Sequence, residues 1–202
     1  MAYPLIILGA GASFDSIEFS SHPNRHDFAK YKPPLTDDLF DSSRELFYEI
    51  LNRYPVVGSL ASRVRPRLKS KKSTFEEILQ DLLDKHNVNI PDRDGELVGE
   101  LISLNFYLAD LFKVISEGFY DTDNNYKRLI NEMKMRSIKA YIINFNYDLI
   151  FERSLGLNTE DVNSYIVGSK GGIKILKIHG AYNWHYDPLT VPLNQYSHAQ
   201  SY

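Results

Sequence analysis

Short apolar runs stand near both ends of the chain, and amphipathic helical patterns fill the long region between them. Residues 5–8 form an apolar run that Gly9 ends, as expected for a short buried strand. The same reasoning predicts strands over residues 140–144, 165–167 and 173–178. Residues 148–155 follow the second of these runs and predict a helix, so strand and helix alternate there as in a parallel α/β sheet.

The region between the first two strands predicts four helices. The first spans residues 36–51, with Thr36 as its N-cap, and the second begins at residue 73, where Ser73 and Glu76 have the spacing of a capping box. The third spans about 96–117 and the fourth about 124–135. Two polar segments predict loops: residues 15–32, and the basic residues 63–72, which contain a proline.

This order of elements indicates an α/β protein with a Rossmann-like parallel sheet. A simple crossover between parallel strands does not need four helices, so we interpret residues 33–135 as a helical insertion within a single domain of residues 1–202. Four strands are few for a doubly wound sheet, and no clear strand follows Trp184. The pattern therefore predicts a fold that is incomplete at the C-terminal end.

Composition narrows the function classes. The 202 residues carry a net charge of −3 and no cysteine, which excludes disulfides and cysteine-ligated zinc and favours a reducing, cytoplasmic location. No signal peptide or membrane span is evident, so we expect no membrane partner. The basic run 63–72 lacks interleaved aromatic residues, and nucleic acid binding is therefore not expected. His22 and His26 lack a supporting carboxylate, and no metal is predicted.

The glycine-rich loop after the first strand is the first segment with candidate chemistry. A tight glycine turn that opens a helix lets backbone N–H groups approach a phosphate. The candidate binding residues are Gly9, Ala10, Gly11, Ala12 and Ser13. Phe14 stands where the dehydrogenase fingerprint has its third glycine, and no Gly-Lys-Ser/Thr makes this a P-loop. A purely structural turn explains the loop equally well.

Two further motifs follow the later strands. Asn146 and Asp148 come after the second strand, where open α/β sheets place ligand-binding groups, although either residue could simply cap the next helix. His179, followed by Gly180, ends the last strand. A histidine there can act as a base or bind a ribose hydroxyl, but it could also be a half-buried side chain satisfied by the backbone.

Taken together, the three motifs in this order resemble the sirtuin-like family. The matching segments are Gly-Ala-Gly-Ala-Ser at 9–13, Asn-Tyr-Asp at 146–148 and His-Gly at 179–180. The segment Pro-Pro-Leu-Thr-Asp-Asp-Leu-Phe at 33–40 is similar to one in the sirtuin-like domains of bacterial anti-phage defence proteins. Members of that branch cleave NAD and deplete it, and do not deacylate proteins.

The resemblance implies a role for each candidate residue. NAD is the implied substrate, with its pyrophosphate over residues 9–13 and its nicotinamide beside Asp148. Asn146 would position the attacking water and His179 would accept a proton. The implied partners are NAD and either further copies of the chain or a defence subunit.

The chain departs from full sirtuins in two ways. It lacks the four-cysteine zinc module of the protein deacylases, which argues against deacylation, and it lacks a recognisable Gly-Thr-Ser-like loop for the adenosine half of NAD. Two functions therefore stay open beside the NAD glycohydrolase. One is a non-catalytic nucleotide-binding or assembly module, and the weaker one is an NAD-dependent deacylase.

Overall fold

The computed structural model of the chain describes residues 3–17, 25–89, 94–119, 123–160 and 169–183. The side chains of 25–27, 86–89, 94–95 and 169–170 are not described. The expected strand at 165–167 lies outside these residues, as does the segment after Asn183.

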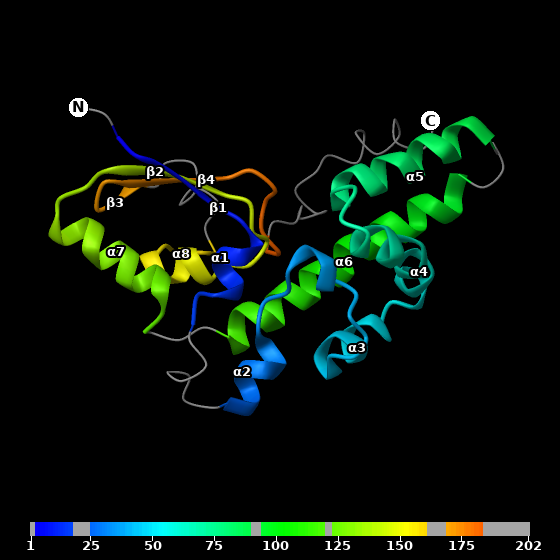
Figure 1. Cartoon of the computed structure of the whole chain (residues 1–202), viewed down its shortest axis with the longest axis horizontal. Helices are drawn as coiled ribbons and strands as arrows, with labels where there is room; N and C mark the ends of the chain where they lie inside the picture. Colours follow the sequence, from blue (N-terminus) through cyan, green and yellow to red (C-terminus); the bar gives the residue numbers. More distant parts are fainter. Residues whose placement is uncertain (1–2, 18–24, 90–93, 120–122, 161–168, 184–202) are drawn as a thin grey trace.

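Three parallel strands form the centre of the sheet (Figure 1). They are β1 (Leu5–Leu8), β2 (Ala140–Asn144) and β4 (Ile173–Lys177), and the two-residue β3 (Ser169–Lys170) pairs antiparallel with β4. The strand order is β1-β2-β4-β3. The prediction of an α/β fold with a Rossmann-like parallel sheet is confirmed, and three of the four expected strands lie where the apolar pattern predicts them.

Helices α1 (Ala10–Phe14), α7 (Asn125–Met135) and α8 (Ile150–Leu155) lie under one face of this sheet (Figure 1). Alternate strand residues such as Ile142 and Ile175 are buried on that side. In the described part of the chain no helix lies over the opposite face. The expectation that β1 is a buried strand is therefore wrong for Leu5 and Ile7, which are 59% and 63% exposed.

The helices between α1 and α7 pack together beside the sheet (Figure 1). They are α2 (Arg25–Tyr31), the 3-10 turn η1 (Thr36–Asp38), α3 (Glu45–Leu51), α4 (Pro55–Lys69), α5 (Phe75–Asn89) and α6 (Asp94–Gly118). The long α6 contacts α2, α3, α4 and α5. Its buried residues, among them Tyr107 and Leu111, fill the core of this helical body.

Two predicted loops contain helices. Residues 63–69 belong to α4, which continues through Pro66, and residues 25–31 form α2. Val57, Leu60, Val64 and Leu68 give α4 a fully buried stripe, and this burial outweighs the backbone hydrogen bond that Pro66 cannot donate.

The predicted helix over 36–51 is broken in the middle. Thr36 is not an N-cap, because η1 begins after Leu35 without a side-chain cap, and α3 begins only at Glu45. Between them the carboxylate of Asp41 accepts hydrogen bonds from the backbone N–H and the hydroxyl of Ser43, at 3.0 and 2.8 Å. Such local side-chain bonds compete with helix formation.

The capping box of α5 lies one residue later than predicted. The hydroxyl of Thr74 accepts a hydrogen bond from the backbone N–H of Glu77, and the Glu77 carboxylate accepts one from the N–H of Thr74. Ser73 and Glu76 do not form the predicted pair. Glu76 is thereby left outside the cap.

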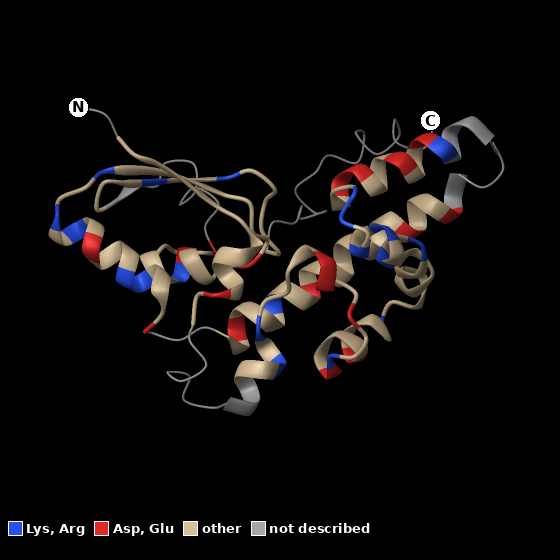
Figure 2. Cartoon of the chain, in the orientation of Figure 1, with Lys and Arg blue, Asp and Glu red and all other residues tan. Residues whose placement is uncertain are grey.

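Three of the six basic residues at 63–72 form ion pairs with described residues of the helical body. Arg63 pairs with the buried Glu100, Arg67 pairs with Asp81 at 2.7 Å, and Lys71 lies 3.7 Å from Asp37. Figure 2 shows the basic residues of α4 beside the acidic residues of α5. None of the described helices combines the length and apolar character that crossing a membrane requires.

The packing of α6 against α2 gives a stability prediction. A Cβ added at Gly118 would lie 2.5 Å from the ring of Tyr31, so Gly118→Ala should lower the free energy of unfolding by about 1–3 kcal/mol through overpacking. Gly58, inside α4, has no atom within 4 Å of the added Cβ. Gly58→Ala should therefore raise stability by about 0.5–1 kcal/mol. Urea denaturation measures both, and equal effects at the two positions would contradict this packing.

Candidate active site

The three sequence motifs meet at one edge of the sheet. In the strand register Leu8 pairs with Asn144, and Asn144 pairs with Lys177, so the three parallel strands end side by side. The residues that follow each strand therefore emerge at the carboxyl edge, where open α/β sheets bind ligands. The glycine loop, the Asn-x-Asp segment and His179 therefore share one edge.

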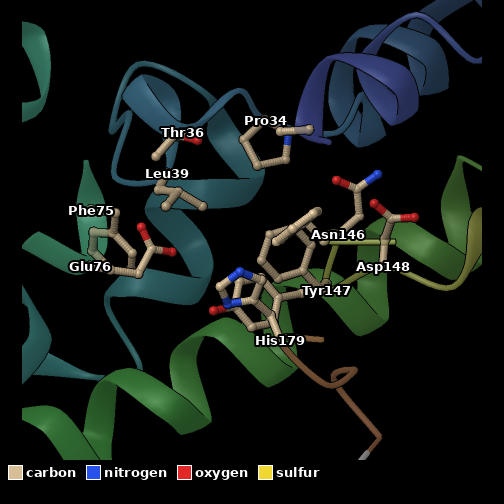
Figure 3. A pocket seen from close by; sticks show the side chains of 12 residues that line it. Pro34, Thr36, Leu39, Phe75, Glu76, Asn146, Tyr147, Asp148 and His179 are labelled. Atoms are coloured by element: carbon tan, nitrogen blue, oxygen red, sulfur yellow. The ribbon is translucent and has the colours of Figure 1, made fainter. Parts of the chain in front are cut away.

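A cavity of about 400 Å³ opens at this edge, between the sheet and the helical body (Figure 3). The sheet side contributes Asn146, Tyr147, Asp148 and His179. The remaining lining residues come from α1, from the segment around η1, from α5, from α6 and from the end of β2: Ala10, Pro34, Thr36, Leu39, Phe75, Glu76, Phe112 and Phe145. The cavity thus depends on both bodies of the fold.

Asn146 is held by a buried hydrogen-bond network. Its amide Nδ2 donates to the hydroxyl of Ser13 at 2.9 Å, and that hydroxyl lies 3.0 Å from the hydroxyl of Tyr126. The backbone N–H of Asn146 donates to Oδ1 of Asn144 at 3.0 Å. Both Ser13 and Asn146 are buried. Their side chains are consequently fixed in position, with Asn146 at the wall of the cavity.

Asp148 has a structural contact as well as a place in the cavity wall. Its Oδ1 accepts a hydrogen bond from the backbone N–H of Ile150, the first residue of α8, at 3.1 Å. Asp148 is not the N-cap itself, because that position belongs to Leu149. Burial raises the pKa of Asp148, while Lys177 and the hydroxyl of Ser13 act in the opposite direction. In Figure 3 its carboxylate lies next to the amide of Asn146.

A buried ion pair lies behind these residues. Lys177 Nζ donates to Oε1 of Glu152 at 2.9 Å and to the backbone carbonyl of Asp148 at 2.6 Å, and both ionic side chains are fully buried. The same Oε1 accepts from Nδ2 of Asn144 at 2.8 Å. Because Asn144 holds the N–H of Asn146 and Lys177 holds the carbonyl of Asp148, the ion pair fixes both ends of the Asn-Tyr-Asp segment.

His179 is the exposed member of the site. Its ring lies 5.2 Å from the ring of Phe145 and 6.0 Å from that of Tyr147, centroid to centroid. In Figure 3 the imidazole overlaps the ring of Tyr147, away from the amide of Asn146 and the carboxylate of Asp148. The site therefore has an amide and carboxylate side, an aromatic centre and an imidazole side.

The glycine loop forms the start of α1, with Gly9 at the N-cap. A Cβ at Gly9 or Gly11 would meet no atom within 4 Å, so open space adjoins both residues. Ala10 lines the cavity, and Ala12 packs against the core. The predicted phosphate contact of Ser13 stays a prediction, because the structure places its hydroxyl against Tyr126 and Asn146.

Comparison of the chain with family models, with curated proteins and with solved structures finds no match. Among the described residues no three His, Asp or Glu side chains gather so as to hold a metal ion. His22 and the side chain of His26 lie outside the described part.

Sequence reasoning missed four contributors to the site: Glu76, Phe112, Tyr126 and Lys177. The first three lie on helices whose sequence patterns predict an amphipathic helix but no functional role for these residues. The position of Lys177 could have revealed its role. A lysine at an inward-facing position of a parallel strand requires a buried partner.

The ion pair predicts a pH dependence of stability. Burial raises the pKa of Glu152 above its ordinary value of 4.5, and Lys177 only partly offsets this. The folded protein then binds the proton more tightly than the unfolded chain, so the stability from this group is full below pH 4.5 and is lost as the pH rises through the higher folded pKa. Relative to Glu152→Gln, the free energy of unfolding of the wild type should fall as the pH rises above 4.5.

Urea denaturation of both proteins between about pH 5 and pH 8, a range in which folded proteins are generally most stable, measures this difference. Glu49→Gln, an exposed change on α3, is the matched control and should follow the wild type. Parallel curves for the wild type and Glu152→Gln would contradict the assigned direction.

Proposed function

We propose that this protein is an NAD glycohydrolase, which cleaves the bond between nicotinamide and ribose to give nicotinamide and ADP-ribose. The observation that carries the proposal is the cavity at the carboxyl edge of the sheet, which brings Asn146, Asp148 and His179 together beside the glycine loop. These are the residues that the sirtuin-like resemblance selects. The size of the cavity, about 400 Å³, suits one end of a dinucleotide.

In the proposed complex the nicotinamide ring lies among the aromatic side chains of the cavity. The pyrophosphate lies over residues 9–13, where the open space beside Gly9 and Gly11 leaves room for a close approach to the backbone. Asp148 binds the carboxamide of nicotinamide, because its carboxylate is at the cavity wall and accepts hydrogen bonds. Ser13 supports this arrangement by holding Asn146.

The reaction needs water at the anomeric carbon and a group that takes its proton. The bond from the anomeric carbon to the pyridinium nitrogen breaks, and its electron pair leaves with nicotinamide. The water oxygen then bonds to the anomeric carbon and its proton passes to His179, directly or through a ribose hydroxyl. The amide oxygen of Asn146, to which no described residue donates, accepts a hydrogen bond from that water.

The cellular role that we propose is NAD depletion during anti-phage defence, in the cytoplasm. It rests on the resemblance of residues 33–40 and of the three motifs to defence-associated sirtuin-like domains. Assembly with further copies of the chain, or with a second defence subunit, belongs to the same proposal. We assign no metal and no membrane or nucleic acid partner.

The proposal predicts that His179→Ala and Asn146→Ala each lower the rate of nicotinamide release from NAD by about 10²–10⁴-fold. His179 is exposed, so His179→Ala should fold normally, and a thermal melt checks this. Asn52→Ala, at an exposed position on the helical body and not among the residues that line the cavity, is the control and should keep the wild-type rate. Chromatography of nicotinamide and ADP-ribose over a range of protein concentrations measures the rates.

Full activity in either site variant would contradict the residue assignments. A wild-type chain that binds NAD but releases no nicotinamide at any concentration would favour the non-catalytic nucleotide-binding module instead.

A further inference from the structure

The carboxylates in the cavity lining are not balanced by basic side chains. Glu76 and Asp148 both contribute carboxylates, whereas no lysine or arginine of the described residues lines the cavity. Phosphate and carboxylate ligands seek positive groups, so the interior of this cavity does not suit an anion. Its electrostatics favour a ligand group with a positive charge.

Glu76 is the more available of the two carboxylates. It lies in the first turn of α5, where Glu77 and not Glu76 forms the capping box with Thr74. Glu76 is exposed, and no described residue donates a hydrogen bond to it or forms an ion pair with it. In Figure 3 its carboxylate points into the cavity. After burial, the negative charge of Glu76 is the second cause of the raised pKa of Tyr147, which places Glu76 near that hydroxyl.

The aromatic lining suits a flat cation. Phe75, Phe112, Phe145 and Tyr147 all reach the cavity, and the rings of Phe112 and Tyr147 lie 5.5 Å apart at 31° to each other. Aromatic faces attract cations through their quadrupole, and they also stack on flat heterocycles. A carboxylate beside such rings adds a direct charge interaction.

We propose that Glu76 makes this cavity selective for a positively charged heteroaromatic ring. The application of this inference to NAD as the substrate rests on the proposed function. The nicotinamide ring of oxidised NAD is a pyridinium cation, whereas the ring of NADH is neutral. Glu76, contributed by the helical body, therefore acts as a specificity residue that admits the oxidised dinucleotide.

Glu76 interacts with the positively charged nicotinamide ring of the bound substrate, before the bond to ribose breaks. Cleavage removes the positive charge from the ring, because the bonding electron pair moves onto its nitrogen. Glu76 therefore favours binding more than the chemical step, and its loss should raise KM more than it lowers kcat.

The test measures binding of two small probes by calorimetry or ligand-observed NMR. 1-Methylnicotinamide, methylated on the ring nitrogen, is the cationic probe and nicotinamide is the neutral one, and neither can be hydrolysed at a glycosidic bond. The wild type should bind the cation about 5- to 30-fold more tightly than the neutral ring, the range that cation recognition by aromatic rings and a carboxylate supports.

Glu76→Gln should lose most of this preference and keep its affinity for nicotinamide, because the side chain keeps its shape. Glu77→Gln is the matched control one residue away. It weakens the capping box, so it should lower the melting temperature and leave the preference unchanged. No binding of the cation, no preference in the wild type, or an unchanged preference in Glu76→Gln would each overturn the inference.

Kinetics with NAD separate this inference from the proposed function. If the wild type prefers the cationic probe through Glu76 but releases no nicotinamide from NAD, the glycohydrolase proposal fails and the recognition stands. If the wild type cleaves NAD and Glu76→Gln has an unchanged KM, the inference fails and the proposed activity stands.

Discussion

The buried ion pair between Lys177 and Glu152 is the interaction on which the site depends. Two charges without solvent contact are costly unless further polar groups satisfy them. Here Asn144 donates to Oε1 of Glu152 and the carbonyl of Asp148 accepts from Lys177, whereas Oε2 of Glu152 is buried without a partner among the described residues. The pair links β4 to α8, and Asn144 connects it to β2. A contact that joins the end of two strands to the next helix fixes the backbone from which Asn146 and Asp148 project.

The second constraint is that the cavity needs two bodies. The sheet supplies the amide, the carboxylate and the imidazole, whereas the helical body supplies Phe75, Glu76 and Phe112. Neither part encloses the cavity by itself. The long α6 connects the two, because it carries the core of the helical body at Tyr107 and Leu111 and lines the cavity at Phe112. In this arrangement the residues between β1 and β2 form one wall of the candidate site.

The sequence predicts the strands and the long helices well, because their patterns end at strong signals. Gly9 ends β1 and polar residues end β2, and α6 and α7 lie within two residues of their expected bounds. The cap of α5 could not be assigned from spacing alone, since Ser73 with Glu76 and Thr74 with Glu77 have the same separation. Pro66 led to the wrong prediction of a loop at 63–72. Burial of a whole helix face outweighs the loss of the one backbone hydrogen bond that proline cannot donate.

The site was partly predictable for a related reason. Groups that directly follow strands must share the carboxyl edge, so Asn146, Asp148 and His179 could be placed together from the chain alone. Glu76 and Tyr126 reach the site only through tertiary packing, which no local pattern reveals. The exposed Leu5 and Ile7 likewise could not be foreseen, because an apolar strand does not show which of its faces is covered.

We propose that the nicotinamide end of NAD enters this cavity. Saturation-transfer NMR of NAD with the purified chain tests it most directly, because it reports which protons of the ligand contact the protein. We expect strong transfer to the nicotinamide ring protons, reduced when Phe112, in the cavity wall, is changed to Ala. Transfer to the adenine protons alone, or no transfer at all, would contradict it.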